Sequence, residues 1–264
     1  MQVIAKAGQN LARLMEIVST LRSPSGCLWD RAQGKQDIAR YLLEEAYEVV
    51  DAIENGSAKD MQEELGDLLF HIIFLANLAE ERADFDLADV MAGIEEKMIR
   101  RHPHVFGSKP AASVAAIKEH WDIIKKEEGK GLGTCRERFN GIVKGLPALI
   151  RAQKITQTAA KVGFDWENTE GVLKKVEEEL TELKEAIQSR RQERIAEEMG
   201  DMLFSLVNLC RFLDVDAEAS LRGASHKFVQ RFTSVEEALL KKGKKPETAS
   251  LAEMDRLWEE AKMK

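Results

Sequence analysis

Carboxylates recur at helical spacing in one early stretch of the sequence. Glu44, Glu45 and Glu48 form an E-E-x-x-E set, and Glu64 and Asp67 follow as E-x-x-D. At about 100° per residue, positions three or four apart share one face of a helix. Carboxylate oxygens are the ligands that Mg²⁺ prefers, with waters and phosphate oxygens completing its shell. Two facing helices that carry these sets therefore predict a divalent-metal site in a helical bundle.

The helix that carries Glu64 is predicted to be buried on all sides. Apolar residues cover almost its whole circumference between Leu65 and Leu75, which is typical of a helix surrounded by protein. Glu64 and Asp67 are then expected close to the interior, where unpaired carboxylates are costly or take up protons. A bound cation removes that cost. Glu44, in contrast, points away from the apolar stripe of its helix.

A di-iron carboxylate bundle also uses helical glutamates, but it needs a Glu-x-x-His motif. None of the five histidines has a glutamate three residues before it. His102 and His104 flank Pro103 and lack the i, i+4 spacing of a helical zinc pair. We interpret the stretch around them as the end of a helix followed by a turn.

The acidic pattern occurs a second time, displaced by 134 positions. Glu178 stands 134 positions after Glu44, and Asp201 stands 134 positions after Asp67. The complete second set is Glu178, Glu179, Glu182, Glu198 and Asp201. Five carboxylates in register without a gap exceed what two amphipathic helices share by chance. The sequence therefore predicts a tandem duplication.

The elements that position these residues are predicted to be helices. Apolar residues recur at three and four spacing through residues 11–21, 38–53, 61–78, 87–98, 172–187, 195–213 and 217–240. No segment alternates with a period of two, so we expect an all-α protein built from tandem duplicated helical-bundle units. The charged, glycine-rich residues 125–135 are the best linker candidate. We expect one domain at residues 1–130 and the other at residues 131–264.

Composition limits the partners. A formal net charge of −7 argues against a nucleic-acid surface, while a local group of basic residues or a metal still permits a small anionic substrate. Cys27, Cys135 and Cys210 are scattered and form no C-x-x-C pair, which favours reduced thiols. The start of the chain lacks the apolar core of a signal peptide, and the longest apolar run is too short to span a bilayer. We expect a cytoplasmic protein with neither a nucleic-acid nor a membrane partner.

Several motifs in this order resemble the all-α nucleoside triphosphate pyrophosphohydrolases, and within them the two-domain MazG family. They are SPSGCLWDRAQ near the start, RRHPHVFG at residues 100–107, LPALIRAQKI at 146–155 and VGFDW at 162–166, together with the two acidic sets. The likeness covers almost the full chain. It implies hydrolysis of nucleoside triphosphates, ATP among them, to the monophosphate and pyrophosphate. It also implies Mg²⁺ as the ion, with Mn²⁺ as the alternative.

The resemblance implies roles for named residues. Catalytic roles carry over to Glu178, Glu179, Glu182, Glu198 and Asp201. The last four of these residues would hold the metal. The equivalent metal ligands in the N-terminal half are Glu45, Glu48, Glu64 and Asp67. The general base is left open between one of these carboxylates and a hydroxide on the metal. Nucleotide contacts are implied for Lys175, Glu178, Arg194, Lys227, Arg231 and Trp258, with N-terminal equivalents at Lys97, Arg101 and Trp121.

The two halves differ at two basic positions. Tyr41 stands at the position equivalent to Lys175, and Asp60 stands at the position equivalent to Arg194. The N-terminal half thus lacks two potential partners for a phosphate chain, and charge-assisted contacts of this kind are the strong ones. We therefore expect the main triphosphate site in the C-terminal half.

The resemblance also implies a homodimer, in which each helical unit completes its core, and a role in nucleotide-pool housekeeping. Two alternatives remain open. One is a nucleotide-sensing helical scaffold without catalysis, and the other is a hydrolase that lowers the pool of a signalling nucleotide. Release of pyrophosphate from a panel of nucleotides, with and without Mg²⁺, separates these possibilities.

Overall fold

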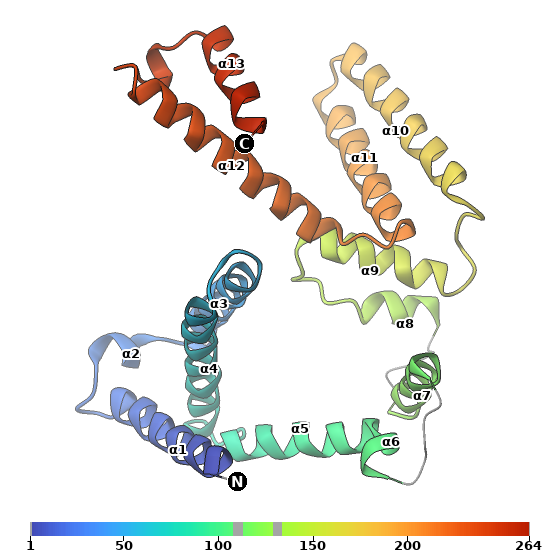
Figure 1. Cartoon of the computed structure of the whole chain (residues 1–264). Coiled ribbons are helices and arrows are strands. Elements are labelled where there is room, and N and C mark those ends of the chain that lie inside the picture. Colours follow the sequence, from blue (N-terminus) through green and yellow to red (C-terminus); the bar gives the residue numbers. More distant parts are fainter. Residues whose placement is uncertain (1, 108–112, 129–133, 264) are drawn as a thin grey trace. The chain divides into compact units, whose positions relative to one another are not determined.

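A computed structural model describes residues 2–107, 113–128 and 134–263 (Figure 1). Every regular element within these ranges is a helix, so the predicted all-α class is confirmed. The chain divides into two compact units, Met1–Trp121 and Asp122–Lys264, and their boundary falls inside α7 (Val114–Glu127). The predicted linker at residues 125–135 lies partly outside the described residues. The predicted domain boundary at residue 130 stays a prediction.

The first unit is a group of helices around one apolar core. Its elements are α1 (Gln2–Arg22), α2 (Leu28–Ala32), α3 (Lys35–Asn55), α4 (Ala58–Glu80), α5 (Leu87–Arg101), α6 (Pro103–Phe106) and the first part of α7. Helices α3 and α4 form a hairpin, and α1 packs against α4. The core forms where α1, α3, α4 and α5 meet, at Val18, Ile38, Ile73, Phe74 and Leu87.

The start of α4 is fixed by a capping box. Ser57 Oγ accepts a hydrogen bond from the Asp60 N–H at 3.3 Å, and the Asp60 carboxylate accepts one from the Ser57 N–H at 2.7 Å. Two backbone donors that the helix leaves unpaired are satisfied in this way. These hydrogen bonds hold the pKa of Asp60 below its usual value. The residue equivalent to Arg194 therefore has a structural role in the first unit.

The second unit repeats this hairpin and adds another. Its elements are the rest of α7, α8 (Cys135–Asn140), α9 (Ala148–Ala160), α10 (Thr169–Ser189), α11 (Gln192–Phe212), α12 (Ala217–Leu240), the short 3₁₀ helix η1 (Pro246–Thr248) and α13 (Leu251–Lys262). Helices α10 and α11 pack side by side, and α9 packs against α11. Helices α12 and α13 form a hairpin around Val235, Leu239 and Leu257. The α10–α11 hairpin is the counterpart of α3–α4.

The predicted helical segments agree with the structure. All seven lie within α1, α3, α4, α5, α10, α11 and α12, except that the sixth runs one residue past the end of α11. The pattern did not predict α9 and α13, whose buried residues are Thr156 and Leu257 respectively. The interpretation of the histidine pair is confirmed, since α5 ends at Arg101 and a one-turn helix starts at Pro103.

The expectation that α4 is buried on all sides is wrong within the first unit. Leu65, Leu69 and Ile72 are 48%, 43% and 40% exposed, because the other helices of the unit cover only one side of α4. Glu64 is accordingly half-buried and Asp67 is exposed, whereas both were expected near the interior. The face that carries these leucines is apolar and has no cover within its own unit.

The expectations about thiols agree with the structure. Cys27, Cys135 and Cys210 are free, so no disulfide joins them. No helix in the described ranges combines the length and the apolarity that crossing a bilayer requires.

Candidate active site

Three glutamates from two neighbouring helices converge in the second unit. Glu179 and Glu182 come from α10, and Glu198 comes from α11. One carboxylate oxygen of each lies within 4.8 Å of the other two. Glu179 is buried, and Glu182 and Glu198 are half-buried. Three oxygens at these separations are a suitable partial shell for a hard divalent cation.

The electrostatics of the cluster reflect this crowding. Partial burial, followed by the charges of Glu179 and Glu198, raises the pKa of Glu182. Lys175 offsets part of the negative charge, because its Nζ donates to Glu178 at 2.7 Å and to Glu179 at 2.8 Å. These two contacts raise the pKa of Lys175, so its ammonium stays protonated.

Asp201 and Arg194 lie at the edges of the cluster. Asp201 follows Glu198 by about one turn of α11, and its side chain lines a cavity together with Lys175 and Glu179. Its oxygens are not among the three that lie within 4.8 Å of one another. Arg194 Nε stands 3.6 Å from Glu198 Oε1. The structure therefore brings together most of the acidic and basic residues that the sequence singled out in this half.

A cavity of about 640 Å³ opens beside the carboxylates. Its wall is mainly apolar and comes from four helices and the segment before α10; the larger side chains are Phe139, Ile155, Val162, Phe164, Trp166 and Phe204. This volume falls within the range of about 300–1,000 Å³ usual for small-molecule pockets. Sequence reasoning missed the cavity and used VGFDW only as a family motif. The available signal was an aromatic pair just before the acidic helix.

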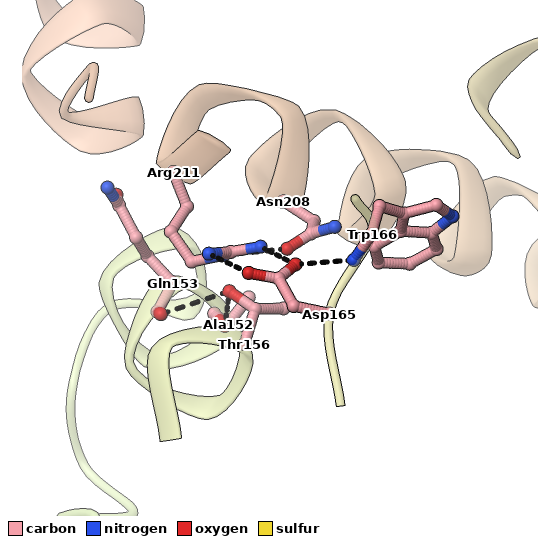
Figure 2. A network of polar contacts seen from close by, with 7 residues as sticks. All are labelled: Ala152, Gln153, Thr156, Asp165, Trp166, Asn208 and Arg211. Carbon is pink, nitrogen blue, oxygen red and sulfur yellow. Dashed lines mark hydrogen bonds and ion pairs between the residues drawn. The ribbon is translucent and has the colours of Figure 1, made fainter. Parts of the chain in front are cut away.

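The segment that carries Phe164 and Trp166 is fixed to α11 by an ion pair (Figure 2). Arg211 donates from Nη1 and Nη2 to Asp165, at 3.0 and 2.6 Å, and the Trp166 N–H donates to the same carboxylate at 2.9 Å. The hydrogen bonds from Arg211 hold the pKa of Asp165 below its usual value. Gly171 leaves room for the indole, since a Cβ there would lie 2.8 Å from Trp166 Cδ1.

The first unit holds an equivalent carboxylate cluster in different surroundings. One oxygen each of Glu45, Glu48 and Glu64 lies within 4.8 Å of the others. Burial, and then the neighbouring carboxylates, raises the pKa of both Glu45 and Glu64. Tyr41 stands in place of Lys175 and stacks on His71, with ring centroids 5.4 Å apart. No ammonium thus lies where Lys175 lies in the second unit.

His71 replaces that cation only in part. Its Nε2 lies 3.4 Å from Glu45 Oε1, but burial lowers the pKa of His71 and so disfavours its charged form. His71 and Phe74 occupy the positions of Ser205 and Asn208 in the 134-residue repeat. Phe74 is 1% exposed and belongs to the core of the unit. Bulkier side chains, the half-buried His71 and the core residue Phe74, therefore stand at positions where the second unit has small polar residues lining a cavity.

The remaining predicted nucleotide contacts lie on other elements. Lys227 and Arg231 are on α12, and the Arg231 guanidinium carbon lies 6.0 Å from the ring centroid of Trp258 on α13. Phe228 also packs on that tryptophan, with ring centroids 5.0 Å apart. Among the residues that the structure describes, Lys227, Arg231 and Trp258 make no ion pair or hydrogen bond with the carboxylate cluster. Their contact with a nucleotide stays a prediction.

Their N-terminal equivalents are placed in a similar way. Lys97 and Arg101 lie on the last turns of α5. Trp121 packs edge-on against the ring of His102, with centroids 5.2 Å apart. Their role in binding a nucleotide likewise stays a prediction.

Both clusters lie within a known domain family. Residues 33–106 and 167–235 match the MazG nucleotide pyrophosphohydrolase domain, so each copy of the acidic motif falls inside one matched segment. The chain belongs to the MazG family. The predicted resemblance is confirmed, and so is the enzyme class, nucleoside triphosphate pyrophosphohydrolase. The two MazG segments also agree with the predicted tandem repeat.

Relatives over the full length support the same assignment. This MazG chain is 46% identical over 257 residues to the nucleoside triphosphate pyrophosphohydrolase/pyrophosphatase MazG of Thermotoga maritima, an alignment that covers 97% of each chain. It is 42% identical over 253 residues to the nucleoside triphosphate pyrophosphohydrolase of Escherichia coli K12, with 95% of this chain and 96% of the relative covered. The uncharacterized protein YabN of Bacillus subtilis is 39% identical over 93% of this chain and 50% of its own length.

Proposed function

We propose that this MazG pyrophosphohydrolase has its main catalytic site in the second unit, at the cluster of Glu179, Glu182 and Glu198. The site converts ATP and other nucleoside triphosphates to the monophosphate and pyrophosphate with Mg²⁺ as cofactor. The observation that carries the proposal is the cavity beside this cluster, with Lys175 and Asp201 on its wall. The first unit has the carboxylates, but Phe74, a core residue, stands at the position of Asn208 in the cavity wall.

The donor set suits Mg²⁺. The three converging groups are all carboxylates, and burial, followed by the charges of Glu179 and Glu198, raises the pKa of Glu182. Glu179, Glu182 and Glu198 would hold the ion, with Asp201 close enough along α11 to join them. Bound Mg²⁺ would neutralise phosphate charge and lower the pKa of an attacking water. Mn²⁺ accepts the same oxygen donors and is the alternative ion.

The chain's own residues supply the rest of the chemistry. A water oxygen bonds to the α-phosphorus, the bond from that phosphorus to the α–β bridging oxygen breaks, and pyrophosphate leaves with the electron pair. A cluster carboxylate takes the proton of the water. Lys175 contacts Glu179 and lines the cavity beside it, where its ammonium can contact the phosphate chain. Arg194, 44% exposed in its side chain, can turn from Glu198 to a phosphate oxygen.

Further contacts are proposed from the α12–α13 hairpin. Lys227 and Arg231 are four residues apart on α12, so they face one side of that helix. They would contact the β- and γ-phosphates, while Trp258 covers the open face of the base. Glu178 is exposed and forms an ion pair with Lys175. When that lysine turns to a phosphate group, the carboxylate of Glu178 would be free to contact the ribose.

The working form is proposed to be a homodimer. Both units leave the same apolar stripe uncovered, formed by Leu65, Leu69 and Ile72 on α4 and by the equivalent Met199, Leu203 and Leu206 on α11. Contiguous apolar faces of this kind mark interaction surfaces. A second copy of the chain covers them and completes each core. A cytoplasmic role in nucleotide-pool housekeeping fits such an enzyme.

The direct test is product analysis with purified protein. We expect nucleoside monophosphate and pyrophosphate in equal amounts from a panel of triphosphates, with phosphate appearing only after a coupling pyrophosphatase is added. Chelation of divalent cations should stop the reaction, and added Mg²⁺ should restore it. Release of phosphate without the coupling enzyme, or turnover that survives chelation, would contradict the proposal.

A further inference from the structure

Asn208 is a buried polar residue in the wall of an apolar cavity. It is 3% exposed, lies on α11 and lines the cavity of the second unit. A buried amide normally has partners for both its oxygen and its nitrogen, because leaving them unpaired is costly. At the equivalent position the first unit has Phe74, a core residue. An amide at this place therefore needs an explanation other than packing.

The orientation of the amide is fixed from behind. Arg211 Nε donates to Asn208 Oδ1 at 2.8 Å, and the rest of the guanidinium is held by two hydrogen bonds to Asp165. An arginine N–H can only donate, so the oxygen of Asn208 must face it and the NH₂ group must face the other way. Figure 2 shows the nitrogen on the side of Trp166. Within the described part of the chain, this nitrogen donates no hydrogen bond.

The position of Asn208 relative to the acidic residues suits a nucleotide. Asp201, Phe204, Ser205 and Asn208 are spaced by three, one and three residues, so they share one face of α11. Asp201 and Asn208 are separated by about 10 Å along the helix axis, from the rise of about 1.5 Å per residue. This is comparable to the distance from the α-phosphate to the base edge within a nucleotide. The apolar and aromatic wall between them offers surfaces on which a base can stack.

The two hydroxyl groups of the wall do not duplicate this donor. Thr156 is buried, and its hydroxyl donates to the backbone carbonyls of Ala152 and Gln153, at 3.2 and 3.0 Å. Its proton is therefore already used. Ser205 lies one turn nearer to Asp201, on the side expected for the sugar. Asn208 is the buried amide at the far end of the cavity, and its nitrogen is placed to contact the edge of a base there.

We propose that this cavity receives the nucleobase and that Asn208 is a specificity-determining residue, whose NH₂ group donates to a carbonyl oxygen of the base. The proposal rests on the C-terminal site proposed above and names its preferred substrates. They are triphosphates whose base carries a carbonyl where adenine and cytosine carry an amino group. An exocyclic amino group meets a second donor there and loses the hydrogen bond. Arg211 and Asp165 act as positioning residues, because they hold the amide in one orientation.

Two matched pairs of nucleotides test this preference. Inosine and adenosine triphosphates differ at the purine 6-position, and uridine and cytidine triphosphates differ at the pyrimidine 4-position, as carbonyl against amino. For the wild-type chain we expect kcat/KM to favour the carbonyl member of each pair by about tenfold or more, the usual effect of one lost hydrogen bond in a buried site. Asn208→Leu should bring both ratios close to one, mainly by slowing the carbonyl members.

A second variant distinguishes recognition of the base by Asn208 from a simple loss of side-chain packing. Asn208→Asp keeps the size of the side chain and one oxygen for Arg211, but it presents an acceptor to the cavity in place of a donor. We expect the preference to reverse toward the amino members. Within each variant the ratio of the two nucleotides is its own control, because a general loss of folding lowers both rates together. Equal effects on both members of each pair, in both variants, would overturn the proposal.

Equilibrium binding measurements test the base site independently of the proposed catalytic function. Calorimetric titration of inosine and adenosine triphosphates in the presence of EDTA measures the base preference without turnover. If hydrolysis fails in all assays but the binding ratio responds to Asn208, the proposed function is wrong and the base site stands. If Mg²⁺-dependent turnover is present while neither rates nor binding respond to Asn208, the base site is wrong and the proposed function stands.

Discussion

At the residue scale, the raised pKa of Glu182 shows that bringing the carboxylates of the cluster together costs folding free energy. Burial and the charges of Glu179 and Glu198 raise its pKa in the folded protein above the ordinary value of 4.5. At pH values between the pKa of Glu182 in the unfolded chain and its higher pKa in the folded protein, the folded state binds more protons than the unfolded chain. The free energy of unfolding of the metal-free protein therefore falls as the pH rises through this window, and the penalty is complete above it.

Replacing this carboxylate should stabilise the metal-free protein. In EDTA at neutral pH we expect Glu182→Gln to raise the thermal midpoint relative to wild type, because one repelling charge is gone. At about pH 4, where the glutamate is largely protonated in both states, the difference should vanish. Differential scanning calorimetry at several pH values measures it. Glu185→Gln, an exposed glutamate on the same helix, is the control and should change little. A lower midpoint for Glu182→Gln at neutral pH would contradict this account of the cluster.

At the scale of single residues, the sequence predicted the carboxylate cluster but not the cavity beside it. The helical spacing of Glu179, Glu182 and Glu198 was enough to predict that they converge, because a bundle must bring facing positions together. Asn208 could not be recognised in the sequence. Its environment depends on the ion pair between Arg211 and Asp165, two residues that are 46 positions apart in the chain.

At the scale of elements, the site is made by one face each of α10 and α11. Val172, Lys175 and Glu179 are spaced by three and four residues on α10, and they line the cavity opposite Asp201 and Asn208 of α11. This register follows directly from the helical period. The paired helices were predictable for the same reason. Helix α9, which closes one side of the cavity, was not predicted, and its one buried residue is the polar Thr156.

The α12–α13 hairpin is expected to contribute to phosphate binding. Lys227→Ala and Arg231→Ala should weaken triphosphate binding by about tenfold or more each, since hydrogen bonds to charged groups are worth about 1.5–3 kcal/mol. Monophosphate binding should change less, because the contacts are with the outer phosphates. Isothermal titration calorimetry with both ligands checks this, and Lys241→Ala, exposed on the same hairpin, serves as the control. Equal losses for the two ligands would show that these residues do not touch the phosphate chain.

At the scale of the whole molecule, the uncovered stripes on α4 and α11 are the main departure from the sequence-based expectation. The sequence placed these leucines in a core, and within their own units they are exposed. The two observations agree if the core is shared between copies, since stable homodimers bury about 2,000 Å² or more of such surface. Sequence periodicity registers that a face is apolar, but it does not tell which molecule covers it.

Charges placed on these stripes should separate the copies. We expect the wild-type chain to sediment as a dimer, and a variant with Leu69→Glu and Leu203→Glu to sediment as a monomer with a lower thermal midpoint. Val3→Glu, which changes an exposed apolar residue of α1 outside both stripes, should leave the dimer intact. A monomeric wild type, or a double variant that stays dimeric, would count against the shared core.

The division of labour between the two units is tested most directly by a matched pair of double variants. One carries Glu64→Gln and Asp67→Asn, and the other carries Glu198→Gln and Asp201→Asn; each removes two charges at nearly constant volume from equivalent positions. Pyrophosphate release from all common triphosphates, measured at saturating Mg²⁺, is the readout. The second variant should lose activity by about 100-fold or more, and the first should stay within about threefold of wild type, since removing ligands of an essential ion is costly only where that ion is used. Loss of all turnover in the first variant, with activity retained in the second, would contradict the proposal and show that the main site lies in the first unit.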